Sequence, residues 1–136
     1  MTRILIVEDN EMNRDMLSRR LKRKGYDIEV AVDGQQGVDM ATDLMPDIVL
    51  MDMSLPVMDG WAATKALRRN DATAALKIIA LTAHAMAGDR EKCLDAGCNE
   101  YTTKPINRAK LIELLNSYLK DDTDAESTEM TEAAGA

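Results

Sequence analysis

The sequence predicts an α/β protein in which five parallel strands form an open, doubly wound sheet covered by five helices. Five short apolar runs bounded by turn residues recur along the chain, and segments of helical period separate them. The runs are rich in consecutive Val, Ile and Leu, which indicates burial on both faces of a parallel sheet. A closed barrel would need about eight strands. A chain of 136 residues suits one such domain.

The five expected strands follow directly from these runs. They are "RILIV" (3–7), "DIEVA" (27–31), "DIVLM" (47–51), "KIIAL" (77–81) and "EYTTK" (100–104). The fifth of these expected strands has the weakest pattern.

Start and stop signals place the first two helices between these strands. Gly25 follows the basic "RRLKRK" end of the first helix, and Asp33 is the expected N-cap of the second. The expected apolar faces are formed by Met12, Met16, Leu17 and Leu21 in the first helix and by Val38, Ala41 and Met45 in the second.

The remaining three helices are expected after the third, fourth and fifth strands. Trp61 opens the third, Gly97 ends the fourth, and Asn107 caps the fifth. The expected apolar faces are Met86, Cys93, Leu94 and Gly97 in the fourth and Leu111, Ile112, Leu115, Tyr118 and Leu119 in the fifth.

Polar side chains follow four of the five strands, at the carboxyl end of each. They are Glu8 and Asp9, Asp52, Thr82, and Lys104, which precedes Pro105. In an open parallel sheet these ends meet at one edge, where functional residues gather. Taken alone, Asp9 has the plain alternative role of a turn former or helix cap, and a lone Thr or Lys at a strand end is more often surface. The joint placement favours a site.

The chemistry of this set indicates phosphoryl transfer. Three carboxylates in one pocket repel one another, and a cation resolves that conflict. Oxygen ligands without His or Cys favour Mg²⁺, which pairs naturally with phosphate oxygens. Lys104 and Thr82 suit other phosphoryl oxygens, and Asp52 is the expected nucleophile.

Four motifs together resemble the receiver domain of two-component response regulators, over residues 2 to about 119. They are "VED", "DIVLMDMSLPVMDG", "ALTA" at 80–83 and "YTTKP" at 101–105. The resemblance implies a flavodoxin-like sheet of strand order 2-1-3-4-5. It implies that Asp52 is the phosphoacceptor, and that Thr82 and Lys104 bind the phosphoryl group. It also implies that Mg²⁺ is held by Glu8, Asp9, Asp52 and the Ser54 carbonyl.

The resemblance further assigns a switch and two tuning positions. Tyr101 matches the family's aromatic switch, acting with Thr82, and the Lys104–Pro105 bond matches one that is usually cis. Ser54 and His84 flank the phosphoryl group and are expected to tune its loss to water. The acidic pair is Glu-Asp where many members have Asp-Asp, and the longer Glu8 side chain can reach the ion directly or through water.

The implied partners are proteins. A histidine kinase or histidine phosphotransfer protein would supply the phosphoryl group. A protein effector would bind the surface of the fourth helix, fifth strand and fifth helix, or the group would pass onward in a phosphorelay. No output domain is expected after Leu119, so the chain reads as a single-domain regulator. It is expected to catalyse only its own phosphorylation and dephosphorylation.

Charge separates a domain from a tail. Of the 24 acidic residues, six lie in residues 121–136, which hold no Lys or Arg, so residues 1–120 carry 18 acidic against 17 basic groups. We expect a receiver domain over residues 1–120 and a disordered acidic tail over 121–136.

Composition and motifs also bear on binding partners and location. The sequence contains no basic stripe interleaved with aromatic residues, so nucleic-acid binding is not expected. With no signal peptide and no membrane-length apolar run, a cytoplasmic location is expected. Cys93 and Cys98 match no metal or redox spacing and are expected to be reduced thiols.

Three other functions share part of this pattern. A Mg²⁺-dependent phosphohydrolase of the haloacid dehalogenase class would need a second Asp two residues after Asp52, where Ser54 stands. A flavodoxin-like cofactor carrier would need a Ser/Thr-rich loop instead of the acidic "EDNEMN". A non-phosphorylated receiver-like binding module would not need the complete set of acids, Thr82 and Lys104.

Overall fold

The computed structural model describes residues 2–55, 57–82, 89–103 and 109–118. The chain divides into two units, Met1–Ile106 and Asn107–Ala136, which are described separately. The second unit contains a helix over residues 109–118, in which Leu111 and Leu115 of the expected apolar stripe are buried. The positions expected for Met86, His84, Lys104, Pro105, Asn107, Leu119 and the acidic tail lie outside the described residues.

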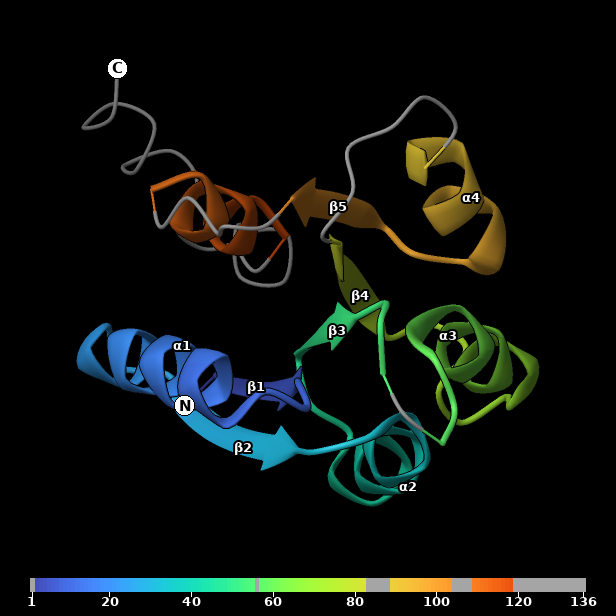
Figure 1. Cartoon of the computed structure of the whole chain (residues 1–136), viewed down its shortest axis with the longest axis horizontal. Coiled ribbons are helices and arrows are strands. Elements are labelled where there is room, and N and C mark those ends of the chain that lie inside the picture. The colour runs from blue at the N-terminus through green and yellow to red at the C-terminus, as the bar shows by residue number, and fades with distance from the viewer. Residues whose placement is uncertain (1, 56, 83–88, 104–108, 119–136) are drawn as a thin grey trace, which may run out of the picture. The chain divides into compact units, whose positions relative to one another are not determined.

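Strands and helices alternate through the first unit (Figure 1). The order is β1 (Arg3–Val7), α1 (Glu11–Arg23), β2 (Asp27–Ala31), α2 (Gly34–Leu44), β3 (Ile48–Asp52), α3 (Gly60–Arg69), β4 (Lys77–Thr82), α4 (Asp89–Ala96) and β5 (Glu100–Thr103). The five strands pair in parallel in the order β2-β1-β3-β4-β5. Both the expected strand order and the expected doubly wound class are therefore confirmed, with strand bounds within one residue of the expected ones.

The core lies on both faces of the sheet, as continuous apolar strands require. On one face, Leu5, Val49 and Ile78 join a cluster that includes residues of α2, α3 and α4. Alternation along the strands places Ile4, Leu50 and Ile79, all fully buried, on the opposite face. The helix α1 packs on β1 and β2, and Figure 1 shows it on the opposite side of the sheet from α2 and α3.

Helix ends follow the expected capping chemistry. The Asp33 side chain accepts a hydrogen bond from the Gln36 amide at the start of α2. Gly25 and Gly97 follow α1 and α4 with φ of 96° and 117°, a left-handed conformation that glycine adopts without steric cost.

The expected apolar face of α1 was wrong in part. Leu17 and Leu21 are buried, but Met12 and Met16 are 74% and 44% exposed. Consecutive helix residues are turned by about 100°, so Met16 lies well away from the face that Leu17 presents to the sheet. Met16 and Met12 therefore belong to the solvent side of α1.

The expected face of α2 also needs one correction. Ala41 is buried and Val38 packs on the core, whereas Met45 is 48% exposed and lies beyond the helix, with a left-handed φ of 48°. Pro46 follows directly, and proline disfavours the helical conformation in the residue before it. The helix therefore ends at Leu44, and Met45 leaves the core.

Both cysteines are buried free thiols, as expected. Burial raises the pKa of the Cys98 thiol to about 11. Because the thiolate is the reactive form, Cys98 is chemically quiet near neutral pH. Within the described residues, no helix has the length and apolar character needed to cross a membrane.

Candidate functional site

The carboxyl ends of three neighbouring strands bring the expected polar residues together. Glu8 and Asp9 follow β1, Asp52 is the last residue of β3, and Thr82 is the last residue of β4. The register aligns Val7 of β1 with Met51 of β3, and Asp52 with Leu81 of β4. This alignment places the ends of all three strands at the same level of the sheet edge.

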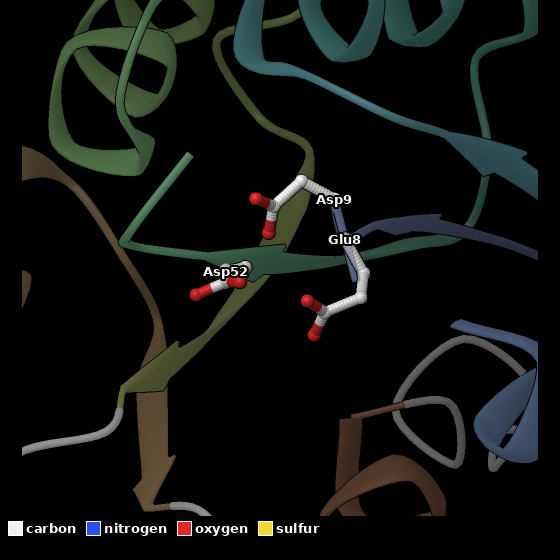
Figure 2. A group of neighbouring side chains, drawn as sticks. All are labelled: Glu8, Asp9 and Asp52. Carbon is white, nitrogen blue, oxygen red and sulfur yellow. The ribbon is translucent and has the colours of Figure 1, made fainter. Parts of the chain in front are cut away.

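Three carboxylates form a cluster at this edge (Figure 2). Each of Glu8, Asp9 and Asp52 offers one oxygen, and these oxygens all lie within 4.8 Å of one another. Glu8 and Asp52 are 1% and 2% exposed, while Asp9 is exposed to solvent. The cluster thus combines two buried acids with one, Asp9, that is exposed to solvent.

The donor set suits a hard divalent cation. All three groups are carboxylates, which Mg²⁺ and Ca²⁺ prefer to nitrogen or sulfur ligands. Three negative charges at this spacing repel one another, and a bound cation would offset that repulsion.

Local hydrogen bonds orient the two buried carboxylates. The Asn10 amide donates to Oε2 of Glu8 at 3.2 Å, and the Ser54 amide donates to Oδ1 of Asp52 at 3.0 Å. Charge-assisted bonds from backbone amides hold a carboxylate in one rotamer. Both acids are therefore preorganised before any ligand arrives.

The alternative role considered for Asp9, that of a helix cap, belongs to its neighbour instead. Asn10 is the N-cap of α1, and its side chain accepts a hydrogen bond from the Asn13 amide at 2.9 Å. Asp9 therefore precedes the cap and takes part in the acidic cluster.

The start of α3 lies against the phosphoacceptor candidate. A Cβ atom at Gly60 would lie 2.4 Å from the Asp52 carbonyl oxygen, a distance that no side chain tolerates. The Gly60 amide donates to the Met53 carbonyl at 3.2 Å. Glycine at this position therefore lets α3 begin directly beside the end of β3.

Thr82 and Tyr101 lie on neighbouring strands and share a face of the sheet. Tyr101 is aligned with Ala80, two residues before Thr82, and alternation gives all three the same face. Thr82 is 2% exposed, and Tyr101 is partly buried against the core. The two expected switch residues therefore lie on the same face of adjacent strands, and their coupling stays a prediction.

Of the three remaining expected site residues, the structure describes only Ser54. Ser54 is exposed, two residues after Asp52, and its amide holds that carboxylate. Lys104 and His84 lie outside the described residues, so their expected roles stay predictions.

The sequence reasoning missed Asn10 and Arg14. Nη1 of Arg14 donates to the backbone carbonyls of Glu8 and Asp9, at 3.1 and 3.4 Å. An Asn before an acidic first helical residue is a recognisable cap signal. No spacing pattern indicates that an arginine reaches back to two carbonyls.

This fold and site define a class of protein: a doubly wound parallel sheet with a cluster of three carboxylates around an aspartate at its carboxyl edge. Residues 4–116 match the family described as response regulator receiver domain, so the chain belongs to that family.

Relatives in sequence include both a protein of similar size and a much larger one. The polar-differentiation response regulator DivK of Brucella anthropi is 38% identical over 87% of this chain and 96% of its own length. Hybrid signal transduction histidine kinase I of Dictyostelium discoideum is 40% identical over 86% of this chain, which spans only 7% of that kinase.

Solved structures agree with this assignment. The receiver domain of the sensor histidine kinase PA1611 from Pseudomonas aeruginosa PAO1 is 43% identical, with a TM-score of 0.80, covering 86% of this chain and 96% of that one; its structure has a magnesium ion coordinated in the active site cleft. The Saccharomyces cerevisiae co-crystal structure of the histidine phosphotransfer protein Ypd1 with the receiver domain of its downstream response regulator Ssk1 matches at 31% identity, with a TM-score of 0.79 over 86% of this chain and 88% of that one.

The chain is therefore a receiver domain related to DivK and to receivers of histidine kinases, as its motifs predict. This family serves phosphoacceptor signalling, and the matches give no support to the alternative of a phosphohydrolase.

Proposed function

We propose that this chain accepts a phosphoryl group on Asp52 from a phosphohistidine of a kinase or phosphotransfer protein, with Mg²⁺ bound beside it. The observation that carries the proposal is the cluster of Glu8, Asp9 and Asp52, with oxygens within 4.8 Å at the carboxyl edge of the sheet. The magnesium ion described for the PA1611 receiver supports the choice of metal.

The roles of the chain's own residues follow from their chemistry. Glu8, Asp9, Asp52 and the Ser54 carbonyl would hold Mg²⁺, which supplies charge neutralisation for the phosphoryl oxygens. The ionised Asp52 oxygen forms the new O–P bond as the N–P bond of the donor histidine breaks, and the electron pair returns to the imidazole nitrogen. Asp52 loses no proton, so no general base is needed. Lys104 and Thr82 would bind other phosphoryl oxygens.

The buried strand that carries Asp52 supports the role of this residue as nucleophile. The strand β3 is buried along its whole length, and the Ser54 amide fixes one carboxylate oxygen. A held carboxylate reacts in one geometry, and such preorganisation is the main contribution a protein makes to this type of transfer.

Signalling would follow from a shift between two conformations. Thr82 would move toward the phosphoryl group, and the Tyr101 ring would take up the space that Thr82 vacates. This change would shift the equilibrium toward the conformation that binds the effector. The shared face of Thr82 and Tyr101 supports this coupling. The effector surface on the fourth helix, fifth strand and fifth helix stays a prediction, as does the choice between terminal output and relay.

Four further parts of the proposal rest on the sequence. The chain would act as a cytoplasmic signalling protein that catalyses only its own phosphorylation and dephosphorylation. Ser54 and His84 would tune the lifetime of the aspartyl phosphate. Its partners would be proteins and not nucleic acid. A receiver domain over residues 1–120 and an acidic tail over 121–136 remain the proposed division.

The test is intact mass spectrometry after incubation with a small phosphodonor and Mg²⁺. One added phosphoryl group, removed by hydroxylamine, is the expected result. The Asp52→Asn variant should gain none. No adduct on the wild type, or an equal adduct on the variant, would contradict the proposal.

A further inference from the structure

Arg14 links the first turn of α1 to the turn that carries two of the clustered acids. Its Nη1 atom donates to the carbonyl oxygen of Glu8 at 3.1 Å and to that of Asp9 at 3.4 Å. Its own backbone amide donates to the Asn10 carbonyl at 2.9 Å. A single side chain of α1 therefore contacts the backbone of both Glu8 and Asp9, the two residues of the preceding turn.

Other hydrogen bonds hold the Glu8 end of this turn. The Glu8 amide donates to the Ala31 carbonyl at 3.0 Å, and the Glu8 carboxylate accepts from the Asn10 amide. These contacts fix Glu8, which is buried. Asp9 is exposed, and among the described contacts its backbone is held by the bond from Arg14.

We propose that Arg14 is a positioning residue for the metal-binding acids, acting through the backbone of Glu8 and Asp9. The inference rests on the proposed function, because it concerns the Mg²⁺ site of that function. Metal affinity depends on holding the ligand oxygens in place, and groups behind the ligands typically affect it by 10–100-fold when removed.

The charge of Arg14 and its hydrogen bonds should have opposite effects on the affinity for Mg²⁺. A guanidinium near a cation site repels the cation, so if charge dominated, its removal would tighten Mg²⁺ binding. If positioning dominates, removal loosens the turn and weakens binding. The two effects differ in sign, so one affinity measurement separates them.

Calorimetric titration of the full chain with Mg²⁺ alone measures this affinity without any phosphoryl transfer. We expect Arg14→Ala to weaken Mg²⁺ binding by about tenfold. The matched control is Arg19→Ala, because Arg19 has the same charge on the same helix but pairs with Asp15, at 3.1 Å. Arg19→Ala should bind Mg²⁺ as the wild type does.

The outcomes separate this inference from the function on which it rests. Unchanged or tighter binding by Arg14→Ala overturns the role of Arg14. A wild type that binds no Mg²⁺ overturns the proposed function as well, as does an Asp9→Asn variant that binds like the wild type. Should Arg14→Ala fail to fold, Arg14→Met decides: it keeps an unbranched side chain but removes both the charge and the Nη1 donor, so weaker binding supports the inference and wild-type or tighter binding overturns it.

Discussion

Neutralising Asp9 should stabilise the protein without Mg²⁺ and destabilise it, relative to the wild type, with Mg²⁺. In the Asp9→Asn variant the repulsion of residue 9 with Glu8 and with Asp52 disappears. Two unit charges 4.8 Å apart repel by about 1 kcal/mol in water and by about 3.5 kcal/mol at an effective dielectric constant of 20. Asp9 is exposed, so the value for water applies to each of its two pairs.

The expected gain without metal is thus roughly 1–2 kcal/mol, which raises the melting temperature of a domain of this size by about 3–6 °C per kcal/mol. With Mg²⁺ at a hundred times its Kd, the wild type should gain about 2.7 kcal/mol, which the variant should largely lose. The stability order of the two proteins should therefore reverse as Mg²⁺ is added.

Thermal unfolding by circular dichroism near neutral pH, with EDTA or with Mg²⁺, measures both effects. Asp71→Asn is the control, because it removes a charge that is also exposed but is not part of the cluster, and it should leave the response to Mg²⁺ unchanged. The reasoning is refuted if Asp9→Asn is less stable than the wild type in EDTA, or if Mg²⁺ stabilises both proteins equally.

Three further predictions concern coupling and stability. Thr82→Ala should still be phosphorylated but should lose phosphorylation-dependent binding of its effector in a pull-down; unchanged binding would reject the Thr82–Tyr101 coupling. Lys92→Gln should lower the free energy of unfolding by about 0.5–1 kcal/mol, because the Lys92 ammonium lies 3.9 Å from the centre of the Trp61 ring; urea titration with no change in midpoint would reject this contribution. The free energy of unfolding should fall as pH rises from about 9 to about 11, because the unfolded chain releases the Cys98 proton at lower pH than the folded chain, in which the pKa is about 11. The slope of unfolding free energy against pH should be smaller in Cys98→Ala. An identical slope in that variant would assign the pH dependence to other groups.

Much of the fold could be predicted because each strand carries its own signal. Runs of consecutive Val, Ile and Leu predicted β1, β3 and β4 within a residue, and parallel pairing then placed Asp52 near Glu8 and Asp9. The site was predictable for the same reason: acids at strand ends are brought together by the sheet itself.

The errors and omissions come from contacts that a pattern does not contain. Met12 and Met16 are apolar and were assigned to the core, but only the sheet decides which side of α1 is covered. The bonds from Arg14 to two carbonyls depend on the angle at which α1 leaves the turn, which no residue spacing indicates. The shared face of Thr82 and Tyr101 required the register of β4 with β5.

The central claim is that Asp52 carries the phosphoryl group, and the most direct measurement locates that group in the sequence. The protein is incubated with phosphodonor and Mg²⁺, reduced with borohydride, which converts an aspartyl phosphate to homoserine, and analysed by peptide mass spectrometry. Homoserine at position 52, dependent on Mg²⁺, is the predicted result. Modification at Asp9 or elsewhere, or none at position 52, would contradict the account.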